Sequence, residues 1–181
     1  MDKQVQFKLD IAEKFLSKIP KSIPKNAAEM RKMEENSEAF LFFASGVIEL
    51  VKRQINDRFA IFDSQNVFYI HGLRKGLSDS GPQGEAKKII ARYFGTPKHT
   101  QNRIDVSKSS LWRLQALRNQ AMHGSIIKAT RYHLAFAYVI REGKTSHEFV
   151  QKTQSPQKYF GQFLVQLKRF TTQMCKILAK S

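Results

Sequence analysis

The chain has 181 residues, of which 41% are apolar and 25% are charged, a composition typical of a folded globular domain and not of a disordered or fibrous protein. Its single cysteine excludes an internal disulfide framework, and no apolar run approaches the ~20 residues that a membrane span requires. We therefore expect one globular domain, cytoplasmic, with no membrane contact and no signal peptide.

The positive charge is concentrated in the second half of the chain. The sequence has 31 Lys and Arg against 15 Asp and Glu, and residues 86–181 alone hold 18 basic and 3 acidic residues, a net charge of +15. A field of this sign attracts polyanions, and counterion release from phosphates drives their binding. Nucleic acid is the expected partner. The alternatives are a solubilising basic surface or a face that meets an acidic protein.

Apolar residues at spacings of three and four predict a succession of amphipathic helices. These helices cover residues 3–19, 26–59, 65–77, 83–94, 107–123 and 156–178. Asn26 is a suitable N-cap for the longest helix, and Ser155 followed by Pro156 is a suitable start for the last. The Gly- and Pro-containing segment 78–82 predicts a break.

Between the last two helices the apolar period changes from about three and a half residues to two. Leu134, Phe136 and Tyr138 alternate with smaller residues, and Glu142-Gly143 supplies a turn. The fold class is therefore mainly α, a helical bundle with a small β-hairpin insertion near residues 132–150. Residues 1–25 are expected to form an N-terminal helix and linker, and residues 26–181 the main helical domain, within one globular unit.

Several kinds of chemistry have no sequence pattern in this chain. No Gly-Lys-Ser/Thr follows the glycines Gly72 and Gly76, so there is no phosphate-binding loop, and the five histidines are not spaced as metal ligands. Glu34 and Glu35 are interpreted as a solvated helix face, and Cys175 as a packing residue. We expect no metal site and no cofactor.

One segment, residues 117–124, has an unusual arrangement of polar side chains. On a helical wheel Arg118 lies inside the apolar arc, whereas Asn119 and His123 lie along one edge of it. A guanidinium in an apolar arc must be paired or must face a groove or a partner, because its burial alone is costly. These three side chains can converge at one rim near the end of the helix.

These residue types suit phosphodiester cleavage in RNA. His123 can take the proton of a ribose 2′-OH or protonate the leaving oxygen, Arg118 can stabilise charge on the phosphorane, and Asn119 can orient the phosphate or the imidazole. No metal ion is needed for this reaction. In the alternative, structural interpretation Arg118 bonds a helix end or a carboxylate, and His123 caps its own helix.

Arg118-Asn119-x-x-x-His123, late in a helix of a small α-bundle, resembles the RNxxxH signature of the HEPN superfamily, the higher eukaryotes and prokaryotes nucleotide-binding domain. The resemblance implies a metal-independent endoribonuclease that leaves a 2′,3′-cyclic phosphate and a 5′-hydroxyl. It also implies a homodimer with a composite active site, and a toxin or defence effector that an antitoxin or other regulatory protein restrains.

The expected function is therefore that of an HEPN-type endoribonuclease with Arg118, Asn119 and His123 as catalytic residues. Nearby residues expected to contact the RNA are the basic side chains Arg113, Lys128 and Arg131 and the exposed aromatic side chain Trp112. Two alternatives remain, a non-catalytic RNA-binding dimer and an interaction module that docks on an acidic regulator.

Overall fold

The computed structural model describes residues 2–62, 69–95, 110–122, 127–129, 134–142, 145–153 and 155–180. In chain order they form α1 (Lys3–Lys18), α2 (Ala27–Phe59), α3 (Ile70–Gly76), α4 (Gly81–Phe94), α5 (Ser110–Ala121), β1 (Ile127–Ala129), β2 (Leu134–Glu142), β3 (Thr145–Thr153) and α6 (Pro156–Lys180). The protein is mainly helical, with one small antiparallel sheet, which confirms the predicted fold class.

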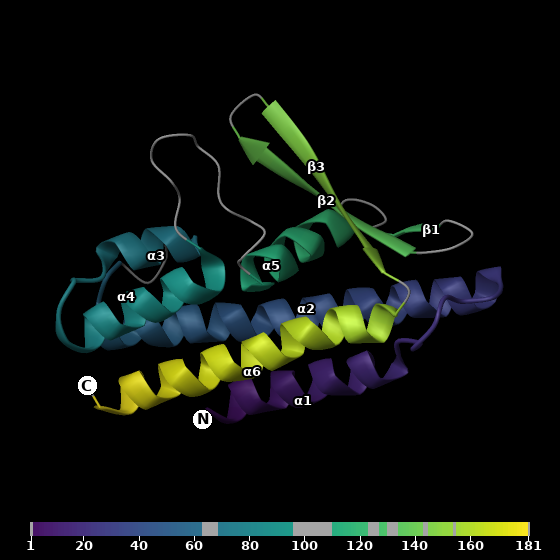
Figure 1. The fold of residues 1–181 in the computed structure, drawn as a ribbon. Coiled ribbons are helices and arrows are strands. Elements are labelled where there is room, and N and C mark those ends of the chain that lie inside the picture. Colours follow the sequence, from purple (N-terminus) through teal and green to yellow (C-terminus); the bar gives the residue numbers. More distant parts are fainter. Residues whose placement is uncertain are drawn as a thin grey trace.

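The long helix α2 is the axis around which the other elements are arranged. The helices α1 and α6 run beside it, α3 and α4 gather towards one end, and α5 and the sheet lie along its other side (Figure 1). The helix α5 packs against α2, α4 and α6 and also against β2. It is thus enclosed on several sides, and this enclosure decides which of its side chains reach the surface.

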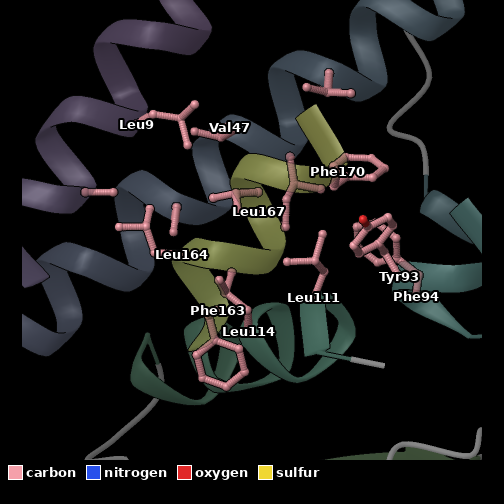
Figure 2. Packing of buried hydrophobic residues seen from close by; sticks show 14 of the residues in the cluster. Leu9, Val47, Tyr93, Phe94, Leu111, Leu114, Phe163, Leu164, Leu167 and Phe170 are labelled. Carbon is pink, nitrogen blue, oxygen red and sulfur yellow. The ribbon is translucent and has the colours of Figure 1, made fainter. Parts of the chain in front are cut away.

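The amphipathic helix α6 supplies the centre of the core. Phe163, Leu164, Leu167 and Phe170 project from it towards α1 and α2 on one side and towards α4 and α5 on the other (Figure 2). Full burial of each such side chain stabilises the fold by about 1.5–3 kcal/mol. The buried face of α1, which includes Leu9, belongs to the same cluster, so the N-terminal helix is packed into this core.

Local capping residues determine where the helices α2 and α4 begin and where α2 ends. The Asn26 side chain accepts a hydrogen bond from the Glu29 backbone N–H at 2.9 Å, which fixes the start of α2 as predicted. At the other end Ala60 takes a left-handed conformation with φ 49° and stops the helix. The helix α4 begins at Gly81, two residues before the predicted start, because Pro82 is well accommodated in a first turn. Residues 65–68, the start of the predicted third helix, lie outside the described residues.

The predicted hairpin is present and is anchored to the bundle by one aromatic side chain. Strands β2 and β3 pair in antiparallel register from Leu134 opposite Thr153 to Glu142 opposite Thr145, so the hairpin extends to Thr153, three residues beyond its predicted end near residue 150. The short strand β1, which was not predicted, adds to β2. Phe136 of β2 is fully buried, with its ring 4.8 Å from that of Tyr159 on α6. The hairpin is thereby held against α5 and α6.

Candidate active site

The helix α5 carries two of the three predicted reaction residues, Arg118 and Asn119. Leu111, Leu114 and Leu117 recur every third residue and are fully buried, so they fix the orientation of the helix in the core. Arg118 and Asn119 follow directly on Leu117 in the last turn. This placement agrees with the wheel, which put Arg118 at the apolar side of the helix.

The two described residues of the motif contact each other. Arg118 is half-buried and Asn119 is exposed, and Nη1 of Arg118 donates a hydrogen bond to Oδ1 of Asn119 at 3.2 Å. Within the described part of the chain, Arg118 forms no ion pair. The structural interpretation, in which Arg118 is paired with a carboxylate, is therefore not supported by a described residue. Its remaining N–H groups can donate to a bound anion.

A hollow of about 520 Å³ lies beside Arg118, and we call it the Arg118 groove. It is lined from α2 and from the end of α5 by Glu35, Glu38, Ala39, Leu41, Phe42, Phe43, Arg118, Ala121 and Met122. Two of these apolar side chains are largely in solvent, Phe42 at 57% and Met122 at 61% exposure. The described lining of the groove thus combines exposed apolar side chains with the guanidinium of Arg118 and the carboxyl groups of Glu35 and Glu38.

The carboxyl groups of α2 are functional candidates that the sequence interpretation did not include. Glu35 pairs with Arg31 at 3.2 Å, as expected of a solvated face, but it also lines the Arg118 groove. Burial, together with the negative charges of Glu34 and Glu35, raises the pKa of Glu38 above its ordinary value. Spacings of three and four place Glu35, Glu38 and Phe42 on one face of α2, which is the signal that could have grouped them.

Of the residues expected to contact RNA, Arg113 faces a different side of α5 from Arg118. It lines a second hollow of about 740 Å³ between α4, α5 and α6, which we call the Arg113 cavity. The prediction that Trp112 is exposed is wrong: its ring is half-buried against the core, because α5 is enclosed by three helices and a strand.

The remaining site residues lie at the margin of the described structure or beyond it. Lys128 is on β1, where its backbone lies opposite Ala135 of β2. His123 and Arg131 lie outside the described residues. In the sequence His123 follows Ala121, the last residue of α5, by two positions.

Comparison with protein-family models, curated protein sequences and solved structures finds no match for this chain. The likeness to the HEPN superfamily therefore rests on Arg118, Asn119 and His123 in their spacing. None of the helices in the described part of the chain combines the length and hydropathy of a bilayer-spanning segment.

Proposed function

We propose that this protein is a metal-independent endoribonuclease of the HEPN type, with its reaction site where α5 ends. The observation that carries the proposal is the environment of the Arg118 side chain. Its half-buried guanidinium contacts Asn119, pairs with no described carboxylate and lines a groove at the end of the helix that precedes His123. An arginine held in this way can bind a phosphodiester without first giving up an ion pair.

In the proposed reaction the ribose 2′-oxygen attacks the adjacent phosphorus and the bond from phosphorus to the 5′-oxygen breaks. His123 accepts the proton of the 2′-OH as general base, and a protonated imidazole returns a proton to the leaving 5′-oxygen. Arg118 stabilises the charge on the phosphorane, and Asn119 holds the guanidinium in position. The products are a 2′,3′-cyclic phosphate and a 5′-hydroxyl.

A homodimer supplies two copies of His123, one for each proton transfer, and we propose that two copies of the Arg118 groove form its interface. The groove carries exposed Phe42 and Met122 together with Glu38 and Arg118, and is therefore both apolar and of mixed charge. A two-fold interface must be self-complementary, and a surface with both signs of charge meets this condition. Phe42 and Met122 would lose their contact with water in such a dimer.

The charge of the chain supports RNA as the substrate. Residues 86–181, which include α5, carry a net charge of +15 and attract a polyanion towards the site. Following the family resemblance, we also propose that the enzyme acts in the cytoplasm as a toxin or defence effector. A regulatory partner such as an antitoxin would restrain it.

The proposal is tested with purified protein, a labelled structured RNA and a DNA of matching sequence, in the presence of EDTA. We expect cleavage of the RNA alone, abolished in His123→Ala and retained in His147→Ala. His147 lies on β3 near the turn of the hairpin and serves as the matched histidine control. Full activity of His123→Ala would contradict the proposal. Salt-sensitive RNA binding without cleavage products would favour the non-catalytic RNA-binding dimer. Co-purification with an acidic protein, without RNA binding, would favour the interaction module.

A further inference from the structure

The Arg113 cavity has a wall composition that the proposed reaction does not explain. It is formed by α4, α5 and α6, and none of the described residues that line it is acidic. Three arginines and three glutamines face it: Arg92, Arg113, Arg169, Gln162, Gln166 and Gln173. Arginine provides a planar set of donors that fits the oxygens of a phosphate, and the glutamine amide both donates and accepts.

The arginines of this cavity differ from nearby lysines in their pairing. On α6 Lys168 is bound to Glu13 of α1 at 2.7 Å, and on α4 Lys87 is bound to Asp79 at 2.8 Å. Across the residues that the structure describes, Arg92, Arg113 and Arg169 have no such ion pair. No described carboxylate thus neutralises the arginines of the cavity, whereas Lys168, one residue before Arg169, and Lys87, five residues before Arg92, are each paired with one.

Two polar atoms of the wall are buried with their hydrogen-bonding capacity unused. Nε of Arg113 and Oε1 of Gln173 are removed from solvent and have no hydrogen-bond partner in the described structure. The Arg113 guanidinium lies 6.0 Å from the ring centre of Phe163, an aromatic contact that favours the cation without satisfying its N–H donors. A buried unsatisfied donor is costly, so a ligand that accepts from Arg113 recovers part of this cost on binding.

The cavity follows the length of a helix. Its wall on α6 runs from Tyr159 to Gln173 at spacings of three and four residues, which at 1.5 Å per residue corresponds to about 21 Å. Arg169 lies near one end of this wall, and Arg92 and Arg113 approach it from α4 and α5. An elongated wall with positive charge contributed by three helices fits a chain of phosphates better than a single phosphate group.

We propose that the Arg113 cavity binds the sugar–phosphate backbone of single-stranded RNA through Arg92, Arg113 and Arg169. The glutamines of α6 would contact the sugars and base edges. The choice of RNA over other phosphate chains rests on the proposed function. The cavity lies on another side of α5 from the Arg118 groove, so it is a binding site that positions substrate and not a part of the reaction site.

The test measures binding of a short fluorescein-labelled polyuridine RNA by anisotropy over a range of salt concentrations, in a His123→Ala background that prevents cleavage. The main variant is Arg92→Gln/Arg169→Gln, because both side chains are exposed and their loss spares the core. The matched control is Arg53→Gln/Arg58→Gln, which removes two exposed arginines of α2 that do not line the cavity. Thermal melting verifies that both variants are folded.

We expect the cavity variant to bind RNA about tenfold or more weakly than the control variant. The slope of the logarithm of the binding constant against the logarithm of the salt concentration should fall in magnitude by about 1.4, the value for two lost single-strand phosphate contacts. Equal loss in the two double variants would overturn the proposal, since it would indicate general electrostatic attraction. ATP or inorganic phosphate that displaces the RNA at equal phosphate concentration would overturn it in favour of a small phosphorylated ligand. Binding is measured without cleavage, so an inactive wild-type protein would refute the proposed function and leave this result standing.

Discussion

Arg113 and Arg118 belong to the same helix, α5, but their side chains line hollows on two different sides of it. Five residues of α-helix turn the direction of a side chain by about 140°, so the two guanidinium groups cannot hold one phosphate together. Residues that are near in sequence therefore fall into two sites. Arg118 belongs with Glu38 and Phe42 of α2, and Arg113 with side chains of α4 and α6.

Substitution of Arg118 is expected to remove most of the cleavage activity. Arg118→Ala should lower kcat by about 10²–10³, the usual effect of deleting a group that stabilises transition-state charge. Arg118→Lys should restore only part of the rate because the planar guanidinium is lost, and Asn119→Ala should cost about tenfold. Initial rates on a labelled RNA, with circular dichroism to verify folding, measure these effects. An Arg118→Ala protein as active as wild type would remove Arg118 from the mechanism.

Charges placed on the rim of the Arg118 groove should dissociate the proposed dimer. Phe42→Asp and Met122→Asp are each expected to give monomers by sedimentation equilibrium and to lose cleavage, because a carboxylate would be buried at the two-fold interface. Phe7→Asp is the control, since Phe7 of α1 is equally exposed, at 62%, and does not line the groove. A wild-type protein that is monomeric at all concentrations, or dimers that survive both substitutions, would show that the interface lies elsewhere.

The hairpin should depend for its position on a single buried ring. Phe136 packs against Tyr159 and Phe160, with ring centres 4.8 and 4.9 Å apart. Phe136→Ala is expected to lower the free energy of unfolding by about 3–5 kcal/mol, the usual range for a buried phenylalanine. Urea denaturation measures the change. Phe7→Ala, at an exposed position, should change it by less than about 0.5 kcal/mol, and a similar small effect at Phe136 would mean that the hairpin does not pack as described.

Folding stability should fall on mild acidification because of His71. Burial, together with the positive charges of Arg74 and Lys75, lowers the pKa of His71 below its ordinary value of 6.5. The unfolded chain therefore binds the proton more tightly than the folded one, and stability decreases as the pH falls through 6.5 towards the lower folded pKa. One such proton contributes a slope of at most about 1.4 kcal/mol per pH unit. Urea denaturation of the wild-type and His71→Gln proteins between neutral pH and pH 5 measures how the free energy of unfolding depends on pH. An equal slope in both proteins would contradict the assignment of this dependence to His71.

Local signals in the sequence were sufficient to predict most of the elements. Asn26 and Pro156 mark the starts of α2 and α6, and the two-residue alternation around Phe136 predicts the hairpin. These features depend on neighbouring residues and so can be read from a short stretch of chain. The strand β1 has three residues, too few to display an alternation, and it exists because β2 offers a free edge to pair with.

The sites were less predictable than the fold because their walls come from distant parts of the chain. The motif residues Arg118 and Asn119 could be recognised from their spacing alone. Glu38 lines the same groove as Arg118 only because α2 packs on α5, and Arg92 and Arg169 line the same cavity as Arg113 only because α4 and α6 pack on α5. A helical wheel gives the direction of a side chain but not the neighbour that it will face. For the same reason it did not reveal that Trp112 packs against the core.

The central claim, that a ribose 2′-OH is the nucleophile, is tested most directly with an RNA that carries a single 2′-deoxy nucleotide at a mapped cleavage position. We predict that wild-type protein in EDTA no longer cuts at the deoxy position. It should still cut at the other positions and leave 2′,3′-cyclic phosphate and 5′-hydroxyl ends at those. Continued cleavage at the deoxy position, or products with 5′-phosphate ends, would contradict the mechanism assigned to Arg118, Asn119 and His123.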